Sequence, residues 1–309
     1  MPQENKTVQL NLRLQPTLKE AAEKAAAQDH RSLTSLIEKL LADHLRTRPT
    51  LEEWHERALA RLYGAVSDKK SDQAKLGTLA RSYCVHTKHG DKISPSALAN
   101  TLRSVHASLG STVPRGDLFY VYHNNPALIP YFTSDSRLSK NGTEEILEFL
   151  AIDTMINRIG FWRVSPVGLA TAISDHVEDR DSERHRAYGL HPGKWFWPFR
   201  LTCNLVELVL HASSFGQKFP SAERAEFRCE WSGLLERQIS DPEQMGYDSG
   251  QIARVDHRIT VGEWPVSELG RSWPEIVSAL GSPMMRLFDN DFDYSPEFIR
   301  QYHLPRLRA

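Results

Sequence analysis

Residues 7–45 read TVQLNLRLQPTLKEAAEKAAAQDHRSLTSLIEKLLADHL, and this stretch decides how the chain begins to fold. From Val8 to Leu14 apolar and polar residues alternate strictly, so the aliphatic side chains fall on one face of a strand and the polar ones on the other. A short strand with one apolar face is not stable alone. It therefore needs a partner strand and a layer that covers its aliphatic face.

Two helical patterns follow the strand and supply that layer. The first begins either with Pro16 as its first residue or with Thr17 as N-cap and Glu20 in capping-box spacing, and its apolar positions are small alanines. After the break at 29–31, Ser32 is the expected N-cap of a second helix. Larger aliphatic residues line one face of that helix: Leu33, Leu36, Ile37, Leu40, Leu41 and Leu45.

A unit of about 40 residues is too small to bury a stable core by itself, and it usually needs a staple or a partner chain. Residues 7–45 contain no cysteine, so we expect two copies to pair strand against strand. The order of elements and these residues resemble the ribbon-helix-helix family of the Arc and MetJ repressor type. The resemblance covers residues 7–45 and no more. It implies a dimer, or a higher homo-oligomer, that binds double-stranded DNA.

Three polar residues of the strand match the positions that, in this family, project from the two-stranded ribbon into the major groove: Gln9, Asn11 and Arg13. Arginine can bond a guanine edge bidentately, and glutamine or asparagine an adenine edge. The resemblance therefore implies that these residues contact bases. The alternative is an amphipathic strand of an ordinary sheet whose exposed face carries them.

The start of the second helix is the other expected DNA contact. In the family, backbone N–H groups at this position hold a phosphate, which carries over to Ser32, Leu33 and Thr34 and agrees with anion binding at helix N-termini. Residues 1–50 hold eight Lys or Arg against six acidic residues, and the net charge of the whole chain is −1. Because nonspecific affinity grows with the number of phosphates neutralised, each dimer should bind modestly.

The whole chain has the composition of an ordinary soluble protein, with 309 residues, 40% of them hydrophobic and 25% charged. No apolar run has the length of a membrane span, and the N-terminus lacks the apolar core of a signal peptide. We therefore expect a cytoplasmic protein with no membrane association. Three widely spaced cysteines, Cys84, Cys203 and Cys229, are expected to be free thiols.

Residues 46–50 (RTRPT) predict a linker, which divides the chain into a DNA-binding domain at 1–48 and an effector or partner domain at 49–309. We expect the second domain to be mainly α-helical and to end in a small α+β part. The boundary between the two parts is expected near residue 220. The helices are predicted at 51–63, 75–83, 94–109, 143–159, 166–177, 201–210 and within 273–288. Two strands are predicted at 225–231 and 252–261.

Three polar or aromatic segments of this second domain have chemistry of their own. Residues 175–186 mix acids, histidines and arginines, which suits acid/base work or a metal, but a solvated helix end or loop is the favoured interpretation. Residues 191–199 are rich in aromatics, which fit core packing better than ligand stacking. Residues 84–89 hold a cysteine and two histidines without a second ligand pair. The sequence therefore assigns no metal, no cofactor and no catalytic residue.

Three functions from different classes are consistent with these patterns. The first is a dimeric, sequence-specific DNA-binding transcription regulator whose C-terminal domain senses a small-molecule or protein effector. The second is an antitoxin-like or assembly protein that binds a protein partner. The third is an enzyme tethered to DNA, which the polar stretch at 175–186 favours.

Overall fold

The computed structural model describes residues 15–28, 32–37, 49–68, 77–109, 119, 129–135, 144–153, 158–179, 191–240, 248–289 and 291–308. By its internal contacts the chain divides into two compact units, Met1–Arg48 and Pro49–Ala309. The division falls within the segment predicted as a linker.

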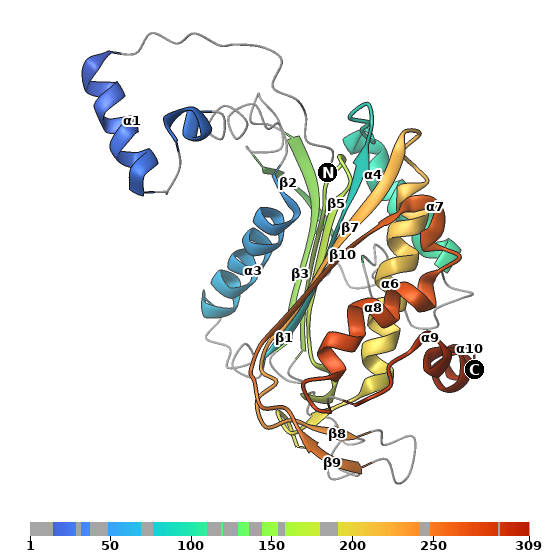
Figure 1. Cartoon of the computed structure of the whole chain (residues 1–309). Helices are drawn as coiled ribbons and strands as arrows, with labels where there is room; N and C mark the ends of the chain where they lie inside the picture. The colour runs from blue at the N-terminus through green and yellow to red at the C-terminus, as the bar shows by residue number, and fades with distance from the viewer. Residues whose placement is uncertain are drawn as a thin grey trace. The chain divides into compact units, whose positions relative to one another are not determined.

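The first unit contains helix α1, Pro16–Gln28, which begins at the proline rather than after a Thr17 cap (Figure 1). Residues 33–37 are also helical, and the Ser32 hydroxyl accepts a hydrogen bond from the backbone N–H of Ser35 at 3.1 Å. The prediction that Ser32 caps this helix is therefore confirmed. The expected base-contacting residues, Gln9, Asn11 and Arg13, lie outside the described residues.

The second unit is built on a seven-stranded antiparallel sheet with the order β10-β7-β1-β5-β4-β3-β2. Its strands are β1 Thr78–Thr87, β2 Tyr131–Asp135, β3 Glu144–Asp153, β4 Arg158–Val164, β5 Leu169–Asp175, β7 Ala222–Trp231 and β10 Arg258–Pro265. A second, three-stranded sheet contains β6 Trp195–Phe196, β8 Gln238–Ser240 and β9 Asp248–Ile252. Strands β2 to β5 form a meander that returns to β1, so the first strand of the unit lies inside the sheet, between β7 and β5.

Helices cover both faces of the large sheet (Figure 1). One face is covered by α3, Leu51–Asp68. The other is covered by α4 Pro95–Leu109, α6 Pro198–Gly216, α7 Val266–Leu269 and α8 Trp273–Met285. The chain then ends in three short helical segments, α9 Pro296–Phe298, η4 Ile299–His303 and α10 Leu304–Arg308.

The expectation of a mainly α-helical second domain is wrong, because three predicted helices are strands of this sheet. Residues 75–83, 143–159 and 166–177 correspond to β1, β3 with β4, and β5. The reason is that both faces of the sheet are covered, so buried residues follow one another without alternation. In β3, Ile146 packs in the cluster that includes Trp54 of α3, whereas its neighbour Leu147 packs in the large core on the α6 side.

The expected separation of a small α+β part near 220 is also wrong. Strand β7 pairs with β1, and β10 pairs with β7, so the C-terminal strands complete the same sheet. The predicted helices at 51–63, 94–109, 201–210 and within 273–288 are confirmed by α3, α4, α6 and α8, and the strand at 225–231 by β7. The strand predicted at 252–261 is interrupted, since β9 ends at Ile252 and β10 begins at Arg258. Across the described ranges no helix is long and apolar enough to cross a membrane.

Candidate functional site

A cavity of about 280 Å³ lies in the second unit, between the centre of the large sheet and helix α6. Charged and polar side chains on its lining are Arg81, Ser174, Asp175, His176, Glu178, Arg200, Asn204 and Glu207. Aromatic residues also line it: Phe149, Phe161, Trp162, Phe196 and Trp231. A cavity with a few converging polar groups among aromatic residues is the usual form of a small-molecule site.

One face of α6 supplies the helical side of this cavity. Arg200, Cys203, Asn204 and Glu207 recur at intervals of three and four residues, so they share one face of the helix. Their neighbours on the same helix, such as Leu205, are buried in the core. Burial raises the pKa of the Cys203 thiol to about 11, so this cysteine is protonated at neutral pH and is a poor nucleophile.

Arg81 of β1 connects the sheet to α6 across the floor of the cavity. Its Nη1 donates to Oδ1 of Asn204 at 3.0 Å, and its Nη2 donates to the hydroxyl of Ser174 on β5 at 3.4 Å. The register of the two strands explains this contact. Leu79 of β1 is opposite Ser174, and Arg81, two residues further along β1, lies on the same face, which is turned toward α6. Arg81 is buried, so its charge is held on the cavity lining.

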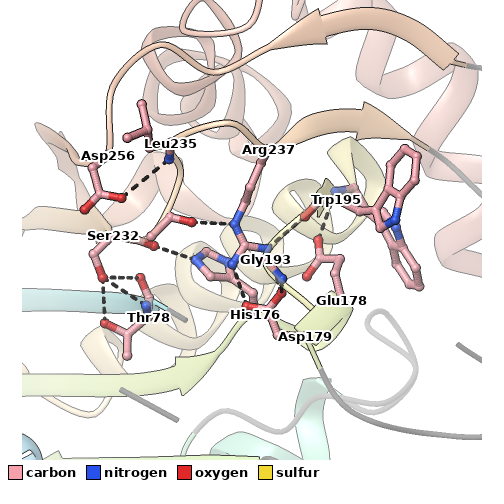
Figure 2. A network of polar contacts seen from close by, with 12 residues as sticks. Thr78, His176, Glu178, Asp179, Gly193, Trp195, Ser232, Leu235, Arg237 and Asp256 are labelled. Atoms are coloured by element: carbon pink, nitrogen blue, oxygen red, sulfur yellow. Dashed lines mark hydrogen bonds and ion pairs between the residues drawn. The ribbon is translucent and has the colours of Figure 1, made fainter. Parts of the chain in front are cut away.

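The segment after β5 supplies the remaining polar groups, and Figure 2 shows how they lie. Nε2 of His176 is 2.8 Å from the backbone oxygen of Ser232, and since a carbonyl only accepts, this nitrogen carries the proton. An oxygen of Glu178 accepts from the backbone N–H of Trp197, at the N-cap of α6, at 2.9 Å. The 3-10 turn η3, Val177–Asp179, therefore joins the end of β5 to the start of α6.

A fully buried ion pair fixes this turn (Figure 2). Arg237 contacts Asp179 bidentately, with Nη1 2.8 Å from Oδ1 and Nη2 2.5 Å from Oδ2. Arg237 also donates to the backbone oxygens of Trp195 and Gly233, and Asp179 also accepts from the backbone N–H of Gly193 at 2.7 Å. The pair thus connects η3, the 191–197 segment and β8, and it positions Glu178 at the cavity.

Burial shifts the pKa of two ionisable groups in this segment, Glu178 and His176. Removal from water raises the pKa of Glu178 to about 7. Burial, followed by repulsion from Arg237, lowers the pKa of His176 to about 4, so the imidazole is neutral at physiological pH. Glu178 is therefore a lining group that can gain or lose a proton near neutrality.

A second polar cluster lies on the α3 side of the sheet. It contains a hydroxyl, an imidazole and a carboxylate in the order that a serine-type catalytic triad has. Nδ1 of His55 is 2.7 Å from the hydroxyl of Ser82, and its Nε2 is 3.2 Å from a carboxylate oxygen of Glu230. Ser82 is 0% exposed, and its hydroxyl also bonds that of Thr171 at 2.6 Å. The cluster therefore connects α3 to strands β1, β5 and β7 inside the second unit.

The structure corrects the interpretation of the polar stretch at 175–186. Its described part, 175–179, is buried rather than solvated, and it contributes to the cavity lining; residues 180–186 lie outside the described residues. The aromatic segment at 191–199 packs as expected, yet Phe196 also reaches the cavity. Ser32, Leu33 and Thr34 lie at the start of the helical segment 33–37, so their predicted phosphate contact stays a prediction.

Sequence reasoning did not identify Arg81, Asn204 and Glu207 as site residues. For the α6 residues a signal was available, because a polar set at helical spacing interrupts one of the most apolar segments of the chain. Within the described part of the chain, no group of three or more His, Cys, Asp or Glu residues is placed to hold a metal ion. In the predicted cysteine and histidine segment at 84–89, Nε2 of His86 lies 3.2 Å from a carboxylate oxygen of Glu226.

The chain matches no protein-family model, no curated protein and no solved structure. Its function must therefore be inferred from its own residues and geometry.

Proposed function

We propose that the protein is a dimeric, sequence-specific DNA-binding transcription regulator whose second unit binds a small-molecule effector. The observation that carries the effector role is the cavity, where buried charged side chains gather around a space of about 280 Å³. Burying charged groups is costly, and proteins concentrate such groups where they bind or react. In this proposal the protein is cytoplasmic.

The DNA-binding role rests on the first unit. Helix α1 and the capped helical segment at 33–37 are consistent with the two helices of a ribbon-helix-helix unit. In this proposal Gln9, Asn11 and Arg13 contact bases from the ribbon. The N–H groups at the start of the second helix, at Ser32, Leu33 and Thr34, contact a phosphate.

The experiment is selection of bound duplexes from a random pool with the full-length protein, followed by affinity measurements on the selected duplex. Arg13→Ala should weaken binding by about 1–3 kcal/mol and relax specificity at one base position. Lys24→Ala is the matched control, because it also removes one positive charge from the first unit, at an exposed position that pairs with Glu20. Failure to select any motif, or equal affinities of the Arg13→Ala and Lys24→Ala proteins, would refute the proposal.

A specific observation favours one second candidate, an enzyme delivered to DNA. Glu178, with a pKa of about 7, has the protonation behaviour of a general acid or base, and it lies on a cavity. The two functions differ in the fate of a bound molecule. A regulator releases its ligand unchanged, whereas an enzyme converts it, so mass spectrometry of a ligand recovered after incubation with wild-type and Glu178→Gln protein separates them.

A further inference from the structure

We infer that the ligand of this cavity is a small organic anion, a carboxylic acid with a flat aromatic body, whose carboxylate is bound by Arg200. The inference rests on the proposed effector role of the cavity and names the chemical class of the effector. It is carried by two features of the lining: a cation that makes no hydrogen bond or ion pair with the residues that the structure describes, and the arrangement of the aromatic rings.

Arg200 is the cation in question. It lies in the first turn of α6, a 19-residue helix, and it is partly shielded from solvent on the cavity lining. Its guanidinium makes no hydrogen bond or ion pair with any residue that the structure describes. A cation at this end of a helix is unfavourable, because the N-terminus of the helix dipole is itself positive. A bound anion would interact favourably with both.

A second guanidinium on the lining can also interact with an anion. Two guanidinium groups, those of Arg81 and Arg200, lie on the lining together with the carboxyl groups of Asp175, Glu178 and Glu207. Glu178 is partly protonated at neutral pH and can then donate a hydrogen bond to a carboxylate.

The aromatic residues define the rest of the ligand. The rings of Phe149 and Trp162 are stacked on one another at the cavity, with centroids 5.8 Å apart and planes 16° apart. On another side, Phe196 is stacked on Phe288, with centroids 5.0 Å apart. Flat apolar walls of this kind favour a flat aromatic group. A volume of about 280 Å³ is at the small end for ligand sites, which suits one ring or two fused rings.

The test is isothermal titration calorimetry of the full-length protein, without DNA, against matched compounds. Phenylacetate and 2-naphthoate are the anions, their amides are the neutral isosteres, and phenethylamine is the cation. At least one acid should bind about tenfold or more tightly than its amide, since hydrogen bonds to a charged group are worth clearly more than neutral ones. Phenethylamine should not bind.

Two arginine variants assign the effect to one residue. Arg200→Gln should weaken the binding of the acid by about tenfold or more and leave the amide unaffected, which also shows that the cavity is still folded. Arg271→Gln, which removes an exposed guanidinium in the loop between α7 and α8, should change neither. Binding of the amide or the amine as tight as that of the acid, an Arg200→Gln protein that binds the acid normally, or no binding of any compound would each overturn the inference. Because DNA is absent, this outcome is independent of whether the first unit binds a duplex.

Discussion

Replacing Asp179 by leucine removes the carboxylate that holds Arg237 in the interior of the second unit. Arg237 is 0% exposed, and its guanidinium contacts both oxygens of Asp179. The substitution leaves a buried positive charge without this counterion, and losing one partner of such a pair costs about 3–5 kcal/mol of unfolding free energy. The Gly193 N–H also loses its acceptor. We therefore expect Asp179→Leu to destabilise the unit by at least about 3 kcal/mol.

The matched control is the double variant Asp179→Leu/Arg237→Met, which replaces both charges by apolar side chains. Buried ion pairs replaced in this way are often close to neutral in stability, because no charge is left behind. The carbonyl oxygens of Trp195 and Gly233 still lose a donor, so part of the loss remains. We expect the double variant to be more stable than the single variant by about 2 kcal/mol.

Urea unfolding monitored by tryptophan fluorescence measures both values. All seven tryptophans of the chain lie between residues 54 and 273, so the signal reports on the second unit and not on residues 1–48. A single variant within about 0.5 kcal/mol of wild type, or a double variant less stable than the single one, would contradict the role given to this ion pair.

Three further predictions concern protonation, backbone geometry and capping. Because folding raises the pKa of Glu178 from 4.5 to about 7, the folded state holds a proton that the unfolded state releases in this pH range. As pH rises from 4.5 to 7, the unfolding free energy of wild type should therefore fall by up to about 3 kcal/mol relative to Glu178→Gln, measured by urea unfolding. Gly77→Ala should destabilise by about 2 kcal/mol or more, since φ is +101° and a Cβ would collide with the backbone oxygen of Ser232, whereas Gly64→Ala, in open space on α3, should stabilise by up to about 1 kcal/mol in the same assay. Ser32→Ala should cost about 1 kcal/mol of local stability, seen as faster hydrogen exchange of the amide that Ser32 caps, and an unchanged exchange rate would argue against the cap.

The elements predicted correctly are those whose residues show one buried face. Helix α3 buries Trp54, Ala58 and Leu62 at helical spacing, and strand β7 has alternating burial. Both patterns can be recognised in the sequence. Strand β1 is not, because its first eight residues are all buried between α3 and α6, and a run of that kind fits a helix as well as a strand. This interior strand of the sheet was thus difficult to identify from the sequence pattern.

The cavity was predictable only in part for the same kind of reason. The acids and histidine at 175–179 were visible as a chemical cluster, but their burial depends on Arg237, which lies 58 residues further along the chain from Asp179. Likewise Arg81 meets Asn204 across 123 residues. Spacing along the sequence carries no information on contacts at this distance. Local patterns could suggest candidate residues but could not bring them together.

The affinity of the full-length protein for its selected duplex, measured with and without a bound aromatic acid, tests the proposed function most directly. Fluorescence anisotropy with a labelled duplex gives the Kd in both conditions. If ligand binding in the cavity regulates the DNA-binding unit, a saturating acid should change the Kd by about fivefold or more in wild type and leave it unchanged in Arg200→Gln. A wild-type Kd that stays the same with the acid bound would contradict a ligand-responsive regulator.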